Sequence, residues 1–291
     1  MRNVLTFLLL LFSLLCNGQS PKLFTTDKEL SSSLINQIYQ DRNGFIWIAT
    51  EDGLNRYDGA KFTIYKHEPN NEHSLAHNFV RTVFEDSKGH LLIGTYIGIQ
   101  MYDPATDNFT PLAKLEDTGE TLESNINSFI ERKNGEIWVS GNVLCKLDIK
   151  DHLLTVRKVD IAVTSPGSLF EDKKQNVWMA KGEEGVYQLT PDNQLTLHLS
   201  KDNGYVKSIC EDQRGNIYVG SIRKGLFIYD KERKTFVPID LKEKGELPVC
   251  FLYSGIPNEL YIGTDGKGVV IYNIRTHEIS EYKFDNNYFD S

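Results

Sequence analysis

The sequence lacks the features that favour binding to nucleic acid. Its 291 residues include 32 Lys and Arg against 40 Asp and Glu, which gives a formal net charge of −8, and no block of five or more basic residues occurs. Because nucleic acid carries a dense negative charge, a complex with this chain would have to overcome net repulsion. We therefore expect no nucleic acid among its partners.

Motifs of several enzyme classes are also missing. The sequence has no G-x-S-x-G and no H-E-x-x-H, and its seven histidines form no short cluster at metal-ligand spacing. His67, His73 and His77 share one segment and could in principle bind a metal, but we interpret them as solvated loop histidines. The sequence thus predicts no catalytic site, no bound metal and no cofactor.

Cysteine is scarce, with four residues and no C-x-x-C pair. Cys16 falls in a segment that we expect to be removed, which leaves Cys145, Cys210 and Cys250. Three cysteines allow at most one internal disulfide in an oxidising compartment. We favour the interpretation that they are small apolar residues buried in strands.

Only one long apolar run is present, at the N-terminus. Residues 1–3 are a short positive start, Val4 to Leu15 are apolar, and residues 16–18 place small side chains before a cleavage point ahead of Gln19. These features are typical of a signal peptide at residues 1–18, too short to span a bilayer as a stable helix. A lipoprotein signal using Cys16 is the alternative, although Leu15 is unusual before such a cysteine. We expect a periplasmic protein whose membrane contact depends on downstream segments absent from this sequence.

One pattern recurs six times along the chain. Each copy consists of an apolar strand, an acidic turn ending in Gly, an aromatic strand, a strand that starts with Gly, and a fourth strand. In the first copy these parts are residues 34–40, 41–44, 45–50, 53–58 and 61–66. Equivalent central positions are separated by 45, 46, 40, 40 and 43 residues, and they are Trp47, Leu92, Trp138, Trp178, Tyr218 and Tyr261.

This period matches one blade of a β-propeller. Four short strands in about 40–45 residues fit a propeller blade, whereas leucine-rich repeats are shorter and ankyrin or tetratricopeptide repeats show helical periodicity. We therefore predict an all-β propeller of four-stranded antiparallel blades. The six predicted blades span about residues 31–66, 76–112, 123–158, 165–199, 204–239 and 247–284.

Three repeated positions have a predicted structural role. In each D-x-x-G turn the Asp carboxylate accepts hydrogen bonds from turn amides and the Gly adopts a positive φ. These pairs are Asp41 with Gly44, Asp86 with Gly89, and Asp212 with Gly215. The aromatic residues of the central position should pack between adjacent blades. The third copy has lost the Asp and the fourth has lost the Gly, so we expect Asn176 to supply the positive φ there.

The two ends of the repeat region suggest a larger ring. The sixth copy already contains its own outer strand at about residues 277–284, so residues 22–26 form a predicted spare strand before the first copy. Propellers commonly close when a terminal strand completes the last blade, because an open ring exposes strand edges. A spare strand therefore predicts a seventh blade. We expect this sequence to be the N-terminal part of a longer polypeptide.

The segment from Gln40 to Gly59, QDRNGFIWIATEDGLNRYDG, resembles the two-component regulator propeller repeat. The looser pattern of that family extends over about residues 22–284. The resemblance implies the periplasmic sensor region of a hybrid two-component system, whose relatives carry two seven-bladed propellers, a β-sandwich, a membrane helix, and histidine kinase, receiver and DNA-binding domains. It also implies oligosaccharide sensing, and homodimerisation is conceivable through the full-length sensor. It implies no kinase chemistry in these residues.

Topology indicates where a ligand would bind. In a four-stranded meander the loops after strands two and four share one face, and the D-x-x-G turns lie on the other. Charged and aromatic residues on or beside the first set of loops suit sugar rings and hydroxyls. These ligand-binding candidates are Glu51, Asp52, Arg56, Tyr96, Arg223, Lys224, Asp265 and Lys267. Charged loop residues are also commonly just solvated.

Two alternative functions remain open from the sequence. A secreted propeller enzyme, such as a lyase or a glycosidase-like protein, would need an acid/base pair or a metal set on one face. A protein-interaction scaffold would bind its partner through the flat face of the ring.

Overall fold

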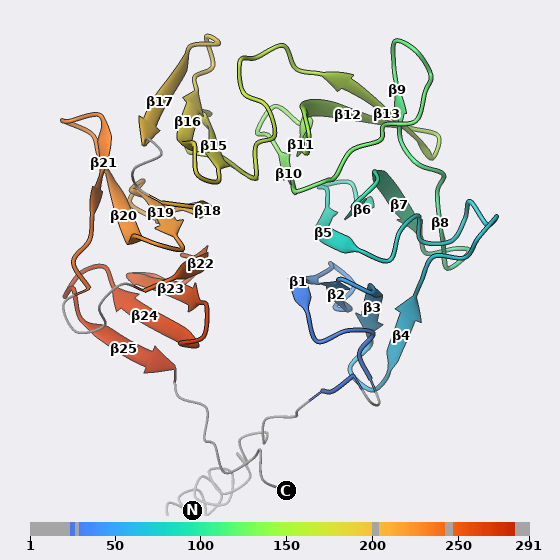
Figure 1. The fold of residues 1–291 in the computed structure, drawn as a ribbon, viewed down its shortest axis with the longest axis horizontal. Helices are drawn as coiled ribbons and strands as arrows, with labels where there is room; N and C mark the ends of the chain where they lie inside the picture. Colours follow the sequence, from blue (N-terminus) through green and yellow to red (C-terminus); the bar gives the residue numbers. More distant parts are fainter. Residues whose placement is uncertain (1–23, 27–28, 200–203, 242–246, 283–291) are drawn as a thin grey trace, which may run out of the picture.

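Six antiparallel sheets follow one another around a ring (Figure 1). The structure is a computed structural model that describes residues 24–26, 29–199, 204–241 and 247–282. The predicted all-β propeller with six four-stranded blades is confirmed. No helix within these ranges has the length and apolar character needed to cross a membrane. The predicted signal peptide at residues 1–18, including Cys16, lies outside the described residues.

Each blade is a meander in which consecutive strands pair. Blades 1 to 3 contain β1 (Ile35–Gln40), β2 (Ile46–Thr50), β3 (Gly53–Tyr57), β4 (Phe62–Tyr65), β5 (Val80–Glu85), β6 (Leu91–Thr95), β7 (Ile99–Asp103), β8 (Asn108–Phe109), β10 (Ser128–Glu131), β11 (Ile137–Ser140), β12 (Leu144–Lys150) and β13 (Leu153–Lys158). Blades 4 to 6 contain β14 (Ser168–Glu171), β15 (Val177–Lys181), β16 (Gly185–Leu189), β17 (Leu195–Leu199), β18 (Val206–Glu211), β19 (Ile217–Ser221), β20 (Gly225–Asp230), β21 (Thr235–Pro238), β22 (Val249–Tyr253), β23 (Glu259–Thr264), β24 (Val269–Asn273) and β25 (Ile279–Tyr282).

Blade 3 has a fifth strand that the repeat pattern does not contain. The outer strand of blade 2, β8, is only two residues long. The chain then forms β9 (Lys114–Leu115), which pairs in parallel with β13 at the outer edge of blade 3. This excursion joins the outer rims of blades 2 and 3.

The hydrophobic core lies between the blades. Trp47 of blade 1 is fully buried against blade 2 residues such as Ile93 and Tyr102, and the Trp47 and Tyr102 rings lie 4.9 Å apart. Trp178 of blade 4 packs in the same way against Val219 and Phe227 of blade 5. Trp138 and Tyr218 are buried against blades 4 and 6 respectively. The predicted inter-blade packing of these aromatic residues is confirmed.

The aspartate of the turn also fixes the central aromatic residue. Asp41 Oδ1 accepts hydrogen bonds from the amides of Asn43 and Phe45, as predicted, and Gly44 has a φ of +89°. Asp41 Oδ2 accepts a further bond from the indole N–H of Trp47. Turn and core are therefore held by one carboxylate.

In the degenerate fourth copy the prediction for Asn176 is wrong. Gln175, with a φ of +66°, adopts the left-handed conformation there. Its amide donates to the Asp172 carbonyl, as the Gly89 amide donates to Asp86, so Gln175 holds the fourth position of the turn. Asn176 is buried instead, and its side chain donates to Asp172 Oδ2. The geometry of the turn thus gives the positive φ to the fourth residue, counted from the aspartate, whatever its type.

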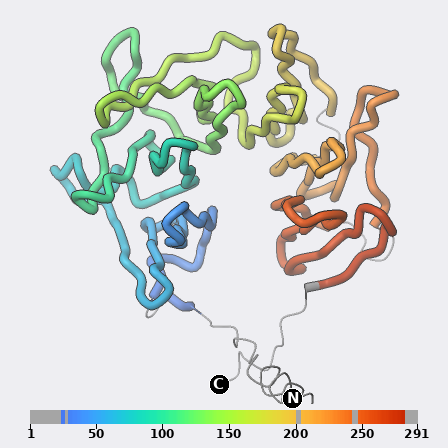
Figure 2. The backbone as a smooth tube through the Cα atoms, turned by 180° about the vertical axis from the view of Figure 1, so that it is seen from behind, coloured from blue at the N-terminus to red at the C-terminus, as the bar shows by residue number. Residues whose placement is uncertain are grey.

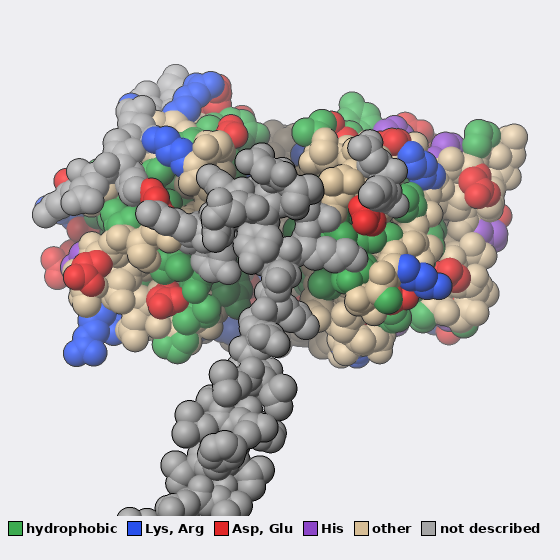
Figure 3. All heavy atoms as spheres, turned by 90° about the horizontal axis from the view of Figure 1, so that it is seen from below, with side chains coloured by type: hydrophobic (Ala, Val, Ile, Leu, Met, Phe, Trp, Pro, Cys, Tyr) green, Lys and Arg blue, Asp and Glu red, His purple; other side chains and the backbone are tan. Residues whose placement is uncertain are grey.

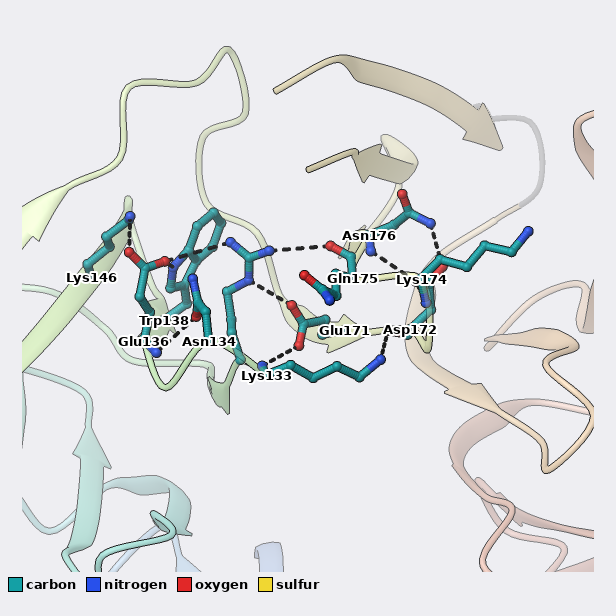
Figure 4. A network of polar contacts seen from close by, with 11 residues as sticks. Lys133, Asn134, Glu136, Trp138, Lys146, Glu171, Asp172, Lys174, Gln175 and Asn176 are labelled. Carbon is teal, nitrogen blue, oxygen red and sulfur yellow. Dashed lines mark hydrogen bonds and ion pairs between the residues drawn. The ribbon is translucent and has the colours of Figure 1, made fainter. Parts of the chain in front are cut away.

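A glutamate at the end of a first strand links each of four consecutive blade pairs. Glu171, at the end of β14, accepts hydrogen bonds from the Lys133 amide at 2.7 Å and from Arg132 Nε at 2.9 Å in blade 3 (Figure 4). Three further turn amides donate to the next blade in the same way, from Arg42 to Glu85, from Ser87 to Glu131, and from Lys173 to Glu211. We call these contacts the turn latches.

The third blade compensates for its missing turn Asp. Glu136, two residues before Trp138, accepts the indole N–H at 3.0 Å and a hydrogen bond from Lys146 (Figure 4). Burial opposes ionisation of Glu136, but these hydrogen bonds outweigh it and lower its pKa to about 2. A carboxylate from a different position thus replaces the absent aspartate.

The ring opens between blade 6 and blade 1 (Figure 2). On blade 1, Ile38 is 61% exposed and Ile64 is also exposed, and on blade 6, Phe251 is 61% exposed beside an exposed Tyr253. Tyr261, the sixth residue of the central series, is only half-buried. Figure 3 views the molecule from below Figure 1, the side on which the ring opens, and hydrophobic side chains are visible there on both halves of the molecule.

The spare strand predicted at residues 22–26 is not present in its described part. Residues 24–26 form no strand. Phe24 instead packs against the rings of Tyr57 and Phe62, at centroid distances of 5.2 and 4.9 Å. The Thr25 carbonyl accepts hydrogen bonds from the Glu29 and Leu30 amides and is therefore not paired with a neighbouring strand.

Candidate functional site

Seven of the eight predicted ligand-binding residues lie in turns between the second and third strand of a blade. Because the strands of a meander alternate in direction, these turns share the face opposite to the D-x-x-G turns. We call it the binding face. Its predicted residues are Glu51 and Asp52 in blade 1, Tyr96 in blade 2, Arg223 and Lys224 in blade 5, and Asp265 and Lys267 in blade 6.

A repeated backbone hydrogen bond positions these turns at the inner rim. The amide of the first turn residue donates to the carbonyl of the residue before the first strand of the same blade. The bonds run from Glu51 to Leu34 at 3.1 Å, from Tyr96 to Phe79 at 3.0 Å, from Ile222 to Tyr205 at 2.9 Å, and from Asp265 to Pro248 at 3.0 Å. The predicted residues Glu51, Tyr96 and Asp265 therefore occupy equivalent places in three blades.

Blades 1 and 2 bring the aromatic and polar groups closest together. Tyr96 is 54% exposed, and its ring lies 5.6 Å from the ring of His77 and 6.1 Å from that of Phe79. Asp52 of blade 1 accepts a hydrogen bond from Asn78 at 3.1 Å, and Asn78 is the residue between His77 and Phe79. An exposed aromatic surface and hydrogen-bonding groups thus meet in one sector.

The charges of this sector are partly paired. Asp52 forms an ion pair with Lys66 at 2.6 Å, and both side chains are about half exposed. The His77 Nδ1 atom accepts a hydrogen bond from the Phe79 amide, while His67 and His73 bond the Leu75 and Phe109 carbonyls. Each of the three histidines is thus held by a different backbone group. No group of three or more His, Cys, Asp or Glu residues suited to a metal occurs in the described part of the chain.

The other half of the binding face carries a second charged sector. Arg223 of blade 5 pairs with Glu183 of blade 4 at 3.2 Å, and both side chains are more than half exposed. Gly204, beside exposed Tyr205, leaves no space for a Cβ because Ser221 Oγ and the side chains of Arg223 and Lys224 lie against it. The structure brings Arg223 and Lys224 together with Tyr205, which the sequence pattern did not indicate.

Arg56 does not lie with the other predicted residues. It lies near the opposite end of β3, where it is paired with Trp47. Three strand residues span about 10 Å, so Arg56 is that far along the strand from Gly53 at the binding face. Its guanidinium lies 5.2–5.8 Å from the rings of Phe45, Trp47, Tyr65 and Tyr102 and forms a 3.0 Å ion pair with Asp107. Burial opposes the charge of Arg56, but Tyr65, Tyr102 and Asp107 outweigh it and raise its pKa. Arg56 thus joins blades 1 and 2.

A cavity of about 910 Å³ adjoins the binding face, since its lining includes Ile97, which follows Tyr96 in the β6–β7 turn. It is lined by the segment between blades 1 and 2, by the excursion around β9 and by the β12–β13 turn, including His67, Leu112 and Leu153. Sequence reasoning missed it because it depends on the unpredicted pairing of β9 with β13.

Three segments of the chain, residues 29–52, 74–96 and 200–223, match the family described as two component regulator propeller. The chain therefore carries repeats of this family. Over 83 residues, 26% of the chain, it is 39% identical to Histidine kinase P4 of Formosa agariphila. That match covers 6% of the kinase, so the chain spans a small part of the length of this relative.

Two solved structures illustrate how widely the fold is shared. The extracellular domain of a putative hybrid two component system from B. thetaiotaomicron is similar with a TM-score of 0.76 and 21% identity, over 92% of this chain and 37% of that one. Virginiamycin B lyase from Staphylococcus aureus is similar with a TM-score of 0.68 and 12% identity, over 90% of this chain and 87% of the lyase. At these identities the likeness establishes the propeller fold alone.

Proposed function

We propose that this chain is the ligand-sensing propeller of a hybrid two-component sensor, that it acts outside the cytosol, and that its ligand is an oligosaccharide. The observation that carries the proposal is the sector in which exposed Tyr96 lies beside His77, Phe79 and the Asp52–Asn78 pair. The similarity to a histidine kinase and to the extracellular domain of a two-component system supports the sensor role.

The sector can bind a sugar without performing chemistry. The face of a sugar ring carries C–H groups that pack on an aromatic ring such as Tyr96, and its hydroxyls both donate and accept hydrogen bonds. Asp52 and Asn78 offer acceptors and donors at a fixed separation because they are bonded to each other. Binding would bias the position of blade 1 relative to blade 2, since Asp52 and Asn78 belong to their junction.

The test is the unfolding temperature of the protein in the presence of a panel of oligosaccharides. A ligand that binds only the folded state raises this temperature with its concentration. We expect Tyr96→Ala to abolish the rise, whereas Tyr253→Ala, with a similarly exposed ring (51%) at the ring opening, should retain it. Equal shifts in both variants, or no shift with any oligosaccharide, would overturn the proposal.

The same panel separates a sensor from the alternative of a propeller enzyme. A binding domain leaves each oligosaccharide intact. Release of shortened or unsaturated products at low protein concentration, measured by chromatography, would replace the sensor proposal with an enzymatic one.

A further inference from the structure

The first strands of four blades contain a β-bulge at the same place. These strands lie on the inner side of the ring (Figure 1), and their register shifts one residue after the strand begins. The extra residues are Asn36, Arg81, Lys207 and Cys250. A bulge redirects the side chain of its extra residue, and bulges are frequent next to binding sites. In each of these four blades the bulge thus redirects one side chain of the inner strand.

The asparagine at this position shows where such a side chain reaches. Asn36 donates a 2.8 Å hydrogen bond to the carbonyl of Val80, the first residue of the next first strand. Asn127, at the same distance before the central residue of blade 3, donates to the Pro166 carbonyl of blade 4 at 3.2 Å. In both cases the asparagine side chain forms a hydrogen bond with the backbone of the following blade.

Arg81 of blade 2 behaves differently. Its side chain forms no hydrogen bond or ion pair with any residue that the structure describes, and its guanidinium lies 5.4 Å from the ring of Phe79. Its Nε atom is buried without a partner. Burying part of a charge without a partner costs free energy. An acceptor supplied from outside the chain would recover that cost.

The following blade contributes an unpaired acceptor. By the register that Asn36 and Asn127 define, the segment of the following blade that corresponds to Arg81 is the one that precedes β10. Asn125 belongs to that segment, and its Oδ1 atom is buried and has no hydrogen-bond partner. Within the described ranges, Arg81 Nε and Asn125 Oδ1 are the two buried side-chain polar atoms without a partner.

The electrostatic setting favours an anion. Lys207, the bulge residue of blade 5, is exposed and likewise has no ion pair among the described residues. Of the two acidic residues in the β2–β3 turn, Asp52 is paired with Lys66 and Glu51 is exposed to solvent. Arg81 and Lys207, which form no ion pair among the described residues, thus lie at bulge positions of inner strands in a chain whose net charge is −8.

We propose that Arg81 binds a negatively charged substituent, a carboxylate or a sulfate ester, of the ligand, while Phe79 and Tyr96 pack against the adjoining sugar ring. This inference rests on the proposed sensing of oligosaccharides. The two terminal nitrogens of a guanidinium match both oxygens of such a group, which a lysine ammonium does not reproduce. The ligand class is therefore an acidic oligosaccharide.

The probes are uronic acid trisaccharides, each as the free acid and as the methyl ester, and sulfated oligosaccharides before and after desulfation. Titration calorimetry on the unaltered protein should show binding of the charged form at least tenfold tighter than that of its uncharged counterpart. If the uronates bind more tightly, the charged substituent that Arg81 binds is a carboxylate. If the sulfated probes bind more tightly, it is a sulfate ester.

The variants locate the charge recognition. Arg81→Gln should lose about tenfold or more in affinity for the charged probe and little for the uncharged one, while Arg81→Lys should lose less. Arg157→Gln, which removes an exposed arginine on the outer strand β13, is the matched control and should not change either affinity. Thermal unfolding of each variant verifies that it is folded. If Arg81→Gln does not fold, the affinities of Arg81→Lys for the charged and the uncharged probe are compared with those of the unaltered protein instead.

The outcomes separate the two proposals. If charged and uncharged probes bind equally, or if Arg81→Gln and Arg157→Gln behave alike, the anion proposal is overturned and oligosaccharide sensing stands. If no oligosaccharide of either kind binds, both proposals are overturned.

Discussion

The indole N–H of Trp47 lies 2.8 Å from Asp41 Oδ2 and donates a hydrogen bond to it. The same relationship joins Trp178 to Asp172 at 2.9 Å. In blade 5 the hydroxyl of Tyr218 replaces the indole and reaches Asp212 Oδ2 at 3.3 Å. A surface turn and the packing between blades are thus set by one side chain in each of these blades.

Replacing Asp41 should lower the free energy of unfolding by more than replacing an ordinary turn residue does. Asp41→Asn loses the charge and turns an amide N–H₂ towards either the indole or the turn amides, so we expect a loss of about 2–3 kcal/mol in the free energy of unfolding. Trp47→Phe should be less than additive with it, because both remove the same bond. Urea unfolding measures both, with Asp117→Asn, an exposed residue, as a control expected within about 0.5 kcal/mol. A loss equal to that of the control would contradict the assigned role.

The turn latch between blades 3 and 4 should be a major stabilising contact. The Glu171 side chain is only 7% exposed and its partner Arg132 is 14% exposed, so Glu171→Ala removes the closer of the two carboxylates that face a nearly buried guanidinium and leaves only the 3.7 Å contact with Glu136. We expect a loss of about 2–4 kcal/mol in the free energy of unfolding. The exposed pair of Glu183 with Arg223 is the control, and Glu183→Ala should cost less than about 1 kcal/mol. Similar losses in the two variants would show that the latch adds nothing beyond a surface ion pair.

The lowered pKa of Glu136 predicts a specific acid sensitivity. Because its folded-state pKa of about 2 lies below the ordinary value of 4.5, its contribution to stability is complete above pH 4.5 and disappears as the pH falls towards 2. The difference in free energy of unfolding between the unaltered protein and Glu136→Gln should therefore shrink between pH 5 and pH 2. Chemical unfolding at several pH values measures this difference. Glu123→Gln, at an exposed site, should show no such trend, and a difference independent of pH would refute the assignment.

The three cysteines of the repeats should differ in reactivity. Burial raises the pKa of the Cys145 thiol to about 11 and that of Cys210 to about 12, whereas Cys250 is only partly buried. Iodoacetamide at pH 8 should therefore modify Cys250 first, and the other two only as the protein unfolds. Peptide mass mapping over time distinguishes the sites. Equal modification rates in the folded protein would contradict the described burial.

We propose that a seventh blade, from residues beyond this sequence, covers the exposed faces of blades 1 and 6. Ile38 and Phe251 are the exposed anchors of those faces, and burying such side chains stabilises by about 1.5–3 kcal/mol each. A protein that continues through one more repeat should unfold at least ~5 °C higher than the 291-residue chain. Binding of a hydrophobic dye should fall in parallel. An unchanged unfolding temperature and unchanged dye binding would count against the seventh blade.

The repeated architecture could be predicted from sequence because each blade requires the same local chemistry. The turn Asp and the central aromatic residue recur at blade spacing, and the structure gives both positions the expected roles in blades 1, 4 and 5. Where a copy lacks the usual turn residue, the repeat pattern did not indicate which residue takes its place. Gln175 adopts the positive φ assigned to Asn176, because the hydrogen bond from the fourth residue to Asp172, and not residue preference, fixes the turn.

The parts of the candidate site that sequence did not reveal depend on contacts between blades. The meander topology placed Tyr96 and Asp52 on one face, but not their proximity through Asn78, which comes from the next segment of the chain. The position of Arg81 depends on a bulge that has no residue signature in this sequence. The turn latches do have a sequence pattern that could have indicated them. The acceptor glutamate directly precedes the turn aspartate at Glu85, Glu171 and Glu211.

The turn latches have a direction, since the earlier blade always donates and the later blade always accepts. A joint of this kind involves two neighbouring units and no others, so inserting or deleting one whole unit leaves the remaining joints intact. Gene duplication could therefore change the number of blades in single steps, provided that each new copy brings both a donor turn and an acceptor glutamate. Gln40 of blade 1, which occupies the acceptor position, has a side-chain oxygen able to receive such an amide from a preceding unit.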